Sequence, residues 1–458
     1  MKHAALAILA GLFLCGAWAP KGGAQLVIDG YGSVGIGTAT PSSDVEVGMR
    51  DPFVAGSVYD AFLVNARSVY VSGRYAYVAT FADRLTVVDI SDPANPVEVG
   101  NAVDVVKLNG ARSVHVSGNC AYVAAFDDDR LTVVDVSDPA SPVVTGSVSN
   151  ATLLNGAISV YVSGRYAYVA AYYGARLSVV DISDSANPLV TGSVSGADLN
   201  GASSVYVSGL YAYVTAANGD RLTVVDVSDP ANPAVVGIVL DATDLNYAQS
   251  VYVSGRYAYV AATSGNRLTV VDISDPTSPA VVGSVPDATL LDGAISVYVS
   301  GRYAYVAARD GRRLTAVDVS DPTGPTVVGT VHDVTSLDGA YSVYVSGRYA
   351  YVAATSGRLT VVDIAGMDVP AAHIGDLAAG SIEASENIHS ANNIYADGGL
   401  NVGPGGIKSD GPVSITDVLR LTPRTAAPGV PVTGDMYIDG SDGNRLKVYD
   451  GSVWRSLW

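Results

Sequence analysis

Short segments in which hydrophobic and polar positions alternate fill most of the chain, and the same segments return at a nearly constant interval. The motif Ser-Val-Tyr-Val-Ser-Gly occurs seven times, with His115 in place of Tyr in the second copy. Its first residues are Ser68, Ser113, Ser159, Ser204, Ser250, Ser296 and Ser342, so the period is 45 or 46 residues. A period of about 40 to 50 residues built from short strands is typical of a β-propeller.

Each copy predicts four strands. In the first copy we expect them at Ser68–Val71, Tyr75–Thr80, Leu85–Ile90 and Val97–Val103. Val, Tyr and Thr fill these segments, while Gly, Asp, Asn and Pro lie between them, as strand sterics and turn geometry require. Apolar residues point to both faces of the predicted sheet. Both faces are therefore expected to be covered, as in a blade that lies between two other blades.

The seventh copy ends at Ile364 without its fourth strand. A matching segment lies before the first copy, because Asp51 to Val58 resembles Asp275 to Val285 with a shortened turn. We expect this N-terminal strand to complete the last blade and close the ring, which removes an exposed sheet edge. The sequence thus predicts an all-β chain with a seven-bladed propeller of four-stranded antiparallel blades over residues 51–364.

The chain outside the repeats predicts several shorter regions. Residues 1–24 have a basic start, an apolar run and then small residues, which is typical of a secretory signal peptide. We expect cleavage after Ala24, with Ala19 as the alternative. Cys15 would be the lipidated residue of a lipoprotein, but Leu14 is bulkier than the residue usual before such a cysteine. The mature protein is expected to be secreted or displayed on a bacterial cell surface.

Residues 25–50 predict a short glycine-rich β segment, residues 365–380 a linker, and residues 381–458 a β-rich stalk. The stalk ends in a hairpin of Met436–Ile438 against Leu446–Tyr449. Large apolar residues are too few in residues 381–421 to build a separate core, so this segment must stack against something.

Composition narrows the classes of partner. The 458 residues carry a formal net charge of −18, so we expect no nucleic acid partner, which would need a clustered positive surface. No apolar run after the signal segment approaches the roughly 18 to 20 residues of a membrane helix, so the protein is not expected to span a membrane. Cys120 is the single cysteine after residue 24, which excludes an intramolecular disulfide in the mature chain.

The segment Leu-Thr-Val-Val-Asp-Ile-Ser-Asp-Pro-Ala-Asn-Pro at Leu85–Pro96 resembles the LVIVD repeat family of bacterial and archaeal cell-surface propellers, and all seven copies share the likeness. The resemblance implies a surface β-propeller without defined catalytic residues. Val34–Val47 and Gly434–Trp458 look like modules of tail-fibre and appendage proteins, which are often trimeric. That likeness implies self-association of this chain, as a homotrimer, through its C-terminal region.

Two polar residue types recur in every copy. One Asp ends each predicted third strand, and it would serve either as a metal-binding ring or, as we expect, as an acceptor of backbone N–H groups in the adjacent turn. These residues are Asp89, Asp135, Asp181, Asp226, Asp272, Asp318 and Asp363. An Arg, such as Arg84, begins each predicted third strand, about 16 Å from the Asp at its end. The repeated Arg and Asp of one blade are therefore not expected to pair. We expect these arginines to pair with loop carboxylates such as Asp198 or Asp244.

The connections from second to third strand differ between copies, and propellers usually bind through variable loops with aromatic anchors. The candidate ligand-binding residues are Phe81, Phe126, Asp128, Tyr172, Tyr173, Arg309 and Arg312. Drift at unconstrained loop tips explains the same variation. Asp127–Asp129 lacks the spacing of a calcium loop, and the histidines are scattered, so we expect neither a metal nor a cofactor.

Three functions remain open at this point. The first is a binding or adhesion protein that recognises a protein or a glycan through the variable loops. The second is a structural appendage or matrix component without a specific ligand. The third, a propeller hydrolase or lyase, would need acids or metal ligands clustered in one or two blades. The sequence contains no such cluster, so we expect no catalytic residues.

Overall fold

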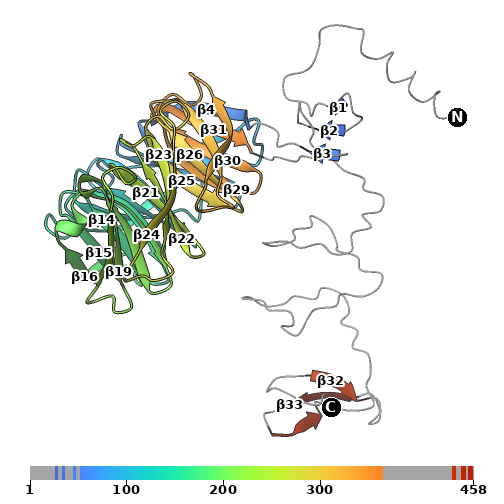
Figure 1. The fold of residues 1–458 in the computed structure, drawn as a ribbon. Helices are drawn as coiled ribbons and strands as arrows, with labels where there is room; N and C mark the ends of the chain where they lie inside the picture. Colours follow the sequence, from blue (N-terminus) through green and yellow to red (C-terminus); the bar gives the residue numbers. More distant parts are fainter. Residues whose placement is uncertain are drawn as a thin grey trace. The chain divides into compact units, whose positions relative to one another are not determined.

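The computed structural model describes residues 52–364 and 452–456, together with the strands Leu26–Ile28, Val34–Ile36, Val45–Val47, Met436–Asp439 and Arg445–Tyr449. Residues 53–363 form seven four-stranded antiparallel sheets arranged as the blades of a propeller (Figure 1). The all-β fold, the number of blades and the number of strands per blade confirm the prediction. The predictions for residues 1–24, for Cys15 and for residues 365–380 lie outside the described residues.

Six blades follow the chain in order, with the first strand of each blade at the channel and the fourth at the rim. Blade 1 is β5 (Ala66–Ser72), β6 (Tyr75–Thr80), β7 (Arg84–Asp89) and β8 (Val97–Val103), and blade 2 is β9 (Ala111–Ser117), β10 (Cys120–Ala125), β11 (Arg130–Asp135) and β12 (Val143–Ser149). Blade 3 is β13 (Ala157–Ser163), β14 (Tyr166–Ala171), β15 (Arg176–Asp181) and β16 (Leu189–Ser195). Blade 4 is β17 (Ala202–Ser208), β18 (Tyr211–Ala216), β19 (Arg221–Asp226) and β20 (Ala234–Leu240), with the 3-10 helices η2 (Ala197–Leu199) and η3 (Ala217–Gly219) in its loops.

Blade 5 is β21 (Ala248–Ser254), β22 (Tyr257–Ala262), β23 (Arg267–Asp272) and β24 (Ala280–Pro286), and blade 6 is β25 (Ala294–Ser300), β26 (Tyr303–Ala308), β27 (Arg313–Asp318) and β28 (Thr326–His332). Blade 7 combines β29 (Ala340–Ser346), β30 (Tyr349–Ala354) and β31 (Ser356–Asp363) with β4 (Phe53–Val64). The connections between the second and third strands of the blades share one face of the ring with the inter-blade loops.

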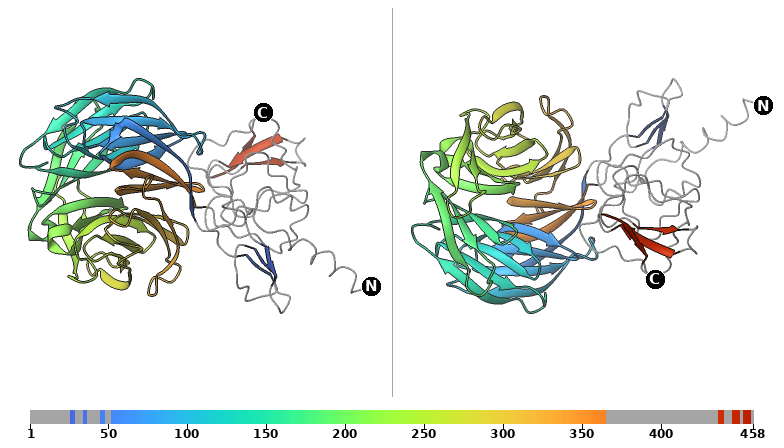
Figure 2. Two further views of the ribbon diagram at one scale, coloured as in Figure 1. Left: turned by 90° about the horizontal axis from the view of Figure 1, so that it is seen from above. Right: turned by 90° about the horizontal axis from the view of Figure 1, so that it is seen from below.

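The N-terminal strand β4 closes the ring, as the sequence predicts. It lies antiparallel to β31, with Asp363 opposite Phe53 and Leu359 opposite Val58. Figure 2 shows these two ends of the propeller, blue and orange, side by side. The strand is longer than the predicted Pro52–Val58 segment, because it continues to Val64 and carries the buried Leu63 into the core between blades 7 and 1.

One glycine shows that β4 replaces a true fourth strand. A Cβ at Gly56 would lie 2.4 Å from the carbonyl oxygens of Pro93 and Ala94, in the turn of blade 1. Gly100 in the fourth strand of blade 1 meets the turn of blade 2 in the same way, 2.5 Å from the oxygen of Pro139. In blades 1 to 5 and in blade 7 the fourth strand therefore packs its glycine directly under the backbone of the next blade.

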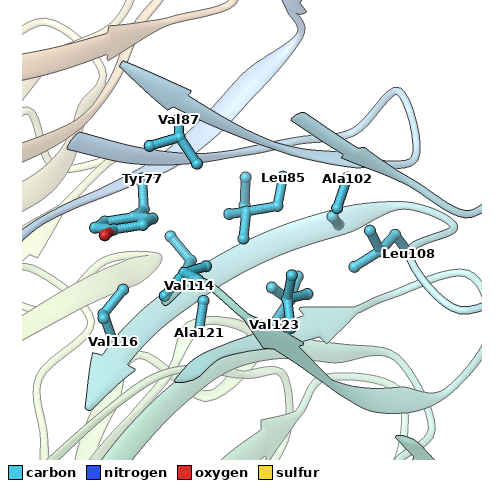
Figure 3. Close-up of a cluster of buried hydrophobic side chains, with 13 residues drawn as sticks. Tyr77, Leu85, Val87, Ala102, Leu108, Val114, Val116, Ala121 and Val123 are labelled. Atoms are coloured by element: carbon cyan, nitrogen blue, oxygen red, sulfur yellow. The ribbon is translucent and has the colours of Figure 1, made fainter. Parts of the chain in front are cut away.

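The core consists of seven hydrophobic clusters, each between two neighbouring blades. Figure 3 shows the cluster between blades 1 and 2, where Leu85 and Val87 of β7 face Val114 of β9 and Val123 of β10. The central strands are buried on both faces, which confirms the expectation from their apolar pattern. Each blade thus stabilises its neighbours rather than a single central core.

Two small three-stranded sheets lie outside the propeller sequence. β1 (Leu26–Ile28) pairs antiparallel with β2 (Val34–Ile36), which pairs parallel with β3 (Val45–Val47). Near the C-terminus, β32 (Met436–Asp439) pairs with β33 (Arg445–Tyr449), with Ile438 opposite Leu446 as in the expected hairpin. A third strand, β34 (Trp454–Ser456), joins this sheet and was not predicted from the sequence.

Candidate functional site

The repeated aspartates cap turns on the face where the connections are uniform. Asp89 accepts a hydrogen bond from the backbone N–H of Ser91 at 2.9 Å, and Asp181 and Asp272 do the same for Ser183 and Ser274. The expected turn role is therefore confirmed. Sequence reasoning missed a second partner, because the carboxylate of Asp89 also pairs with Arg74 of the Ser-Gly-Arg turn. Hydrogen bonding to Arg74 and Ser91 lowers the pKa of Asp89 to about 2.

Two of the arginines at the start of the third strands have the predicted carboxylate partners, whereas Arg130 and Arg176 donate to Ser147 and Ser193 of the fourth strand. Arg221 lies 2.5 Å from Asp198, and Arg267 pairs with Asp244. In both pairs the carboxylate belongs to the loop that precedes the blade, and the arginine belongs to the blade itself. These ion pairs fix the inter-blade loops to the third strands, which is a structural role.

The repeated serine links the inner strands around the channel. The Oγ atom of each Ser accepts the backbone N–H of the Val in the next inner strand, at 3.1–3.3 Å, and Ser342 of the last blade accepts Val69 of the first. A hydroxyl that accepts one bond keeps its own proton to donate. The seven serines therefore stabilise the ring and line its channel with donors.

Seven aromatic side chains form a second ring in the channel. Tyr70, His115, Tyr161, Tyr206, Tyr252, Tyr298 and Tyr344 lie with neighbouring ring centroids 4.6–5.0 Å apart. Burial lowers the pKa of His115 to about 4 and raises the pKa of Tyr161 and Tyr344. At neutral pH this ring is uncharged.

A cavity of about 450 Å³ opens on the variable face at the mouth of the channel. Its walls come from the inner strands, from the loops between second and third strands and from the residue before β21. The lining residues are Arg67, Arg112, Phe126, Ile158, Tyr172, Tyr173, Tyr247, Gln249, Thr263, Ser264, Ile295, Arg309 and Tyr341. A smaller space of about 130 Å³ shares several of these residues and reaches the seven serines. The volume falls in the range of small-molecule pockets, roughly 300 to 1,000 Å³.

The inner-strand residues in this lining were missed at the sequence level. They occupy the position just before each repeated serine, and this position differs between blades: Arg67, Arg112, Ile158, Ser203, Gln249, Ile295 and Tyr341. A β-bulge falls at this position, since in blade 1 Ala66 pairs with Thr80 and Ser68 with Ala79, which leaves Arg67 unpaired. Bulges re-aim side chains next to functional sites. The sequence does contain a signal for these residues, because a position that varies between blades lies directly before the constant Ser-Val-Tyr-Val-Ser-Gly motif.

The predicted loop residues separate into two groups. Phe126, Tyr172, Tyr173 and Arg309 line the cavity, and Phe81 lies under the guanidinium groups of Arg67 and Arg112. Tyr173 is 66% exposed, whereas Phe126 is only 8% exposed. Phe126 is therefore a supporting residue beneath Tyr173, at a centroid distance of 5.1 Å, rather than an exposed anchor.

Like Phe81, the predicted residues Arg312 and Asp128 lie outside the lining of this cavity. Arg312 pairs with Asp338 at 2.8 Å and has a left-handed backbone, with φ of 52°. The corresponding position carries Asp or Asn in four other blades, residue types that tolerate this conformation. Asp128 belongs to the half-buried β10–β11 loop. Neither residue contributes to the wall of the cavity.

Within residues 52–364, no three His, Cys, Asp or Glu side chains lie close enough together to hold a metal ion. None of the described helices has the length and apolar character to cross a membrane. The lining of the cavity is made of Arg, Tyr, Phe, Ile, Gln, Ser and Thr. Its chemistry is that of hydrogen bonding, stacking and positive charge.

A family model described as the LVIVD repeat matches seven segments, residues 65–104, 110–150, 156–195, 201–241, 246–287, 293–333 and 339–367. The first six segments each cover a blade from the bulged inner strand to the end of the fourth strand, and the seventh covers β29, β30 and β31 but not β4. No curated protein shows a significant match to the chain.

Solved structures share the architecture at low identity. A hydrazine synthase structure from Kuenenia stuttgartiensis is 18% identical, with a TM-score of 0.54 over 68% of this chain and 98% of that chain. The WD40 β-propeller domain of Doa1 is 8% identical, with a TM-score of 0.54 over 68% of this chain and 96% of that chain. At these identities the likeness shows the propeller fold alone.

Proposed function

Since the chain belongs to the LVIVD repeat family, whose seven repeats build the propeller, we propose that it is a binding protein without enzymatic activity that recognises a protein or glycan through its variable face. The signal-like residues 1–24 support a place outside the cytoplasm, on a bacterial cell surface or secreted. The tail-fibre likeness of the C-terminal region supports self-association as a homotrimer.

One observation carries this proposal: the cavity at the channel mouth is lined by residues that differ from blade to blade, on a scaffold that is otherwise repeated. At the bulge position, for example, blade 3 has Ile158, blade 5 has Gln249 and blade 7 has Tyr341. A purely structural position would be free to carry the same residue in every blade. A ligand without sevenfold symmetry, by contrast, requires different side chains around one pocket.

The opposite face lacks this asymmetry. Its connections repeat the same Asp-capped turns and the same Arg–Asp pairs in most blades. Binding sites occur preferentially on loops that a rigid scaffold positions, and buried or half-buried aromatic residues are common anchors. Tyr172 and Tyr173 fit this role, since both lie at the rim of the cavity and Tyr173 is largely exposed.

Filling the cavity tests the proposal. In Ile158→Tyr a phenol enters the cavity from a bulge that accommodates Tyr341 in blade 7, so the fold is expected to tolerate it. Binding to a glycan array, or to surface proteins of neighbouring cells, should fall by about tenfold or more, which corresponds to about 1.4 kcal/mol. Tyr172→Ala and Tyr173→Ala should weaken the same interactions.

A matched control uses the opposite face. Leu210→Tyr places the same side chain at an exposed turn where most other blades carry Arg. It should leave every interaction unchanged. Equal binding by the Ile158→Tyr and wild-type proteins would contradict the proposed site. If the wild-type protein binds neither glycans nor proteins, the binding function itself is wrong, and the propeller acts as a structural spacer in an appendage or matrix.

A further inference from the structure

Two arginines at the cavity have no carboxylate partner. Arg67 and Arg112 come from neighbouring inner strands, and both line the cavity. Over the described part of the chain, neither guanidinium lies within ion-pair distance of an Asp or Glu, and the Nε atom of each is buried without a hydrogen-bond partner. Both side chains are half-buried, and a buried polar atom without a partner is costly and needs an explanation.

Several other arginines form ion pairs with aspartates. Arg74 and Arg256 pair with turn aspartates, Arg221 and Arg267 with loop aspartates, and Arg309 at the cavity itself with Asp310 at 2.8 Å. The chain has 44 acidic residues, so carboxylates are abundant. Arg130 and Arg176, which lie away from the cavity and have no ion pair within residues 52–364, donate instead to a serine hydroxyl of the fourth strand.

Aromatic rings hold both guanidinium groups in place. Arg67 lies between Tyr341 and Phe81, at 4.5 and 5.6 Å from the ring centroids. Arg112 lies between Phe81 and Phe126, at 5.1 and 4.3 Å. Phe81 thus stacks with both cations in one alternating row across blades 7, 1 and 2. Stacking occupies the faces of the guanidinium planes and leaves their N–H edges free to donate.

This row concentrates positive charge at one side of the cavity. Burial lowers the pKa of Arg67, and the nearby charges of Arg112 and Arg309 lower it further, which reflects their mutual repulsion. A bound anion would relieve that repulsion and satisfy the free N–H groups. Deeper in the channel, the seven serine hydroxyls add further donors.

The other side of the cavity suits a polar ring. Tyr172, Tyr173 and Tyr247 form an aromatic wall there, and the Tyr172 hydroxyl is hydrogen-bonded to Asn218 at 2.9 Å and lies 3.3 Å from that of Tyr247. Gln249, Thr263 and Ser264 of blade 5 add hydrogen-bonding groups to the lining of the cavity. A sugar ring presents C–H groups to an aromatic face and hydroxyls at its edge, so this wall fits a saccharide better than an extended peptide.

We propose that the cavity binds the carboxylated sugar of an acidic glycan, with the carboxylate at Arg67 and Arg112 and the sugar ring against the tyrosine wall. The planar carboxylate matches the forked N–H edge of a guanidinium, which favours two parallel hydrogen bonds. This inference rests on the proposed binding function and names its ligand class.

Calorimetry with matched sugars tests the ligand class. Glucuronate and galacturonate differ from glucose and galactose by a carboxylate in place of a CH₂OH group. The acidic sugars should bind at least about tenfold more tightly than the neutral ones, since hydrogen bonds to charged groups contribute about 1.5–3 kcal/mol. Arg112→Gln and Arg67→Gln should remove this preference, whereas Arg256→Gln on the opposite face should preserve it.

The contrary outcomes separate the two proposals. Equal binding of acidic and neutral sugars, reduced in both cases by Ile158→Tyr, would overturn the acidic class while the binding function stands. Preference for a short poly-aspartate peptide over every sugar would likewise replace the glycan with an acidic protein. Loss of all binding in the wild-type protein would contradict the binding function as well.

Thermal unfolding separates a ligand-binding role from a structural one. If Arg67 and Arg112 bind a ligand and do not stabilise the fold, Arg67→Met and Arg112→Met each remove an unpaired charge. The Tm of the unliganded protein should then stay equal or rise. Addition of glucuronate should raise the Tm of the wild-type protein but not that of either variant. A lower Tm for both variants, with unchanged glucuronate binding, would assign the arginines to the scaffold and overturn the proposal.

Discussion

At the scale of single residues, His115 is the one departure from tyrosine in the aromatic ring of the channel. It lies between Tyr70 and Tyr161, with centroid distances of 4.7 and 4.8 Å. Burial lowers the pKa of its imidazole to about 4, so the folded protein keeps it neutral. The unfolded chain, in which a histidine has a pKa near 6.5, binds the proton more readily.

This difference predicts a pH dependence of stability. The contribution of neutral His115 is fully present above about pH 6.5 and is lost as the pH falls toward 4, because only the unfolded state takes up the proton in that interval. Across it the free energy of unfolding should fall by about 3 kcal/mol. In His115→Tyr, which restores the residue of the other blades, urea titrations at pH 7 and 4.5 should show a smaller difference. An unchanged difference would contradict this origin.

The arginine pair illustrates what the sequence could and could not predict at this scale. The period predicted the blades, and loop variation pointed to Phe81, Phe126 and Tyr173, which lie at or beside the cavity. Arg67 and Arg112 stand within a motif that was taken as scaffold because its neighbours repeat. The bulge in the inner strand places these side chains in the wall of the cavity. A bulge depends on how two strands pair, so the repeat pattern alone did not reveal it.

At the scale of elements, the fourth strands of blades 1 to 5 and of blade 7 each contain a glycine that contacts the next blade. In β4 this residue is Gly56, and its place against Pro93 and Ala94 follows from blade packing, which composition alone does not show. The same strand carries a bulge between the pairs Val361–Gly56 and Val362–Val54. Close backbone approach at a bulge is a common use of glycine in strands.

Gly56→Ala should therefore weaken ring closure. The added Cβ would lie well under 3 Å from two backbone oxygens, which cannot move without shifting the turn of blade 1. We expect a loss of about 1–3 kcal/mol in the free energy of unfolding, as for overpacked cores. Gly324→Ala is the matched control, because its Cβ would meet nothing closer than 3.4 Å. Equal stability of the two variants would exclude this contact as a determinant of closure.

At the scale of the whole molecule, the ring is held by repeated contacts and closed by one strand that comes from the other end of the repeat region. The serine bond from Val69 to Ser342 and the β4–β31 pairing span this junction. Ala55 and Val58 of β4 pack against the cluster between blades 7 and 1. Without β4 the seventh blade would expose the edge of β31.

Deletion of residues 51–60 should lower the free energy of unfolding by about 3 kcal/mol or more, since burial of one Val-sized side chain alone contributes about 1.5–3 kcal/mol. A rescue variant keeps this deletion and appends Ser-Asp-Pro-Ala-Asn-Pro and a copy of residues 53–64 after Ile364, in the order that the other blades use. Calorimetry should show the stability largely restored. Equal Tm values for the deletion and wild-type proteins would mean that β4 is dispensable.

Closure of the ring by β4 also depends on the order in which the strands are synthesised. Phe53 is synthesised 310 residues before its partner Asp363. At roughly 5–20 residues per second, β4 waits about 15–60 s before β31 exists, while six blades with nearly the same strand sequences assemble beside it. Every fourth strand made in that interval could be displaced by β4 from its own blade. The continuation of β4 to Val64 distinguishes it from those strands, so this extension would direct a late and specific pairing rather than an early one.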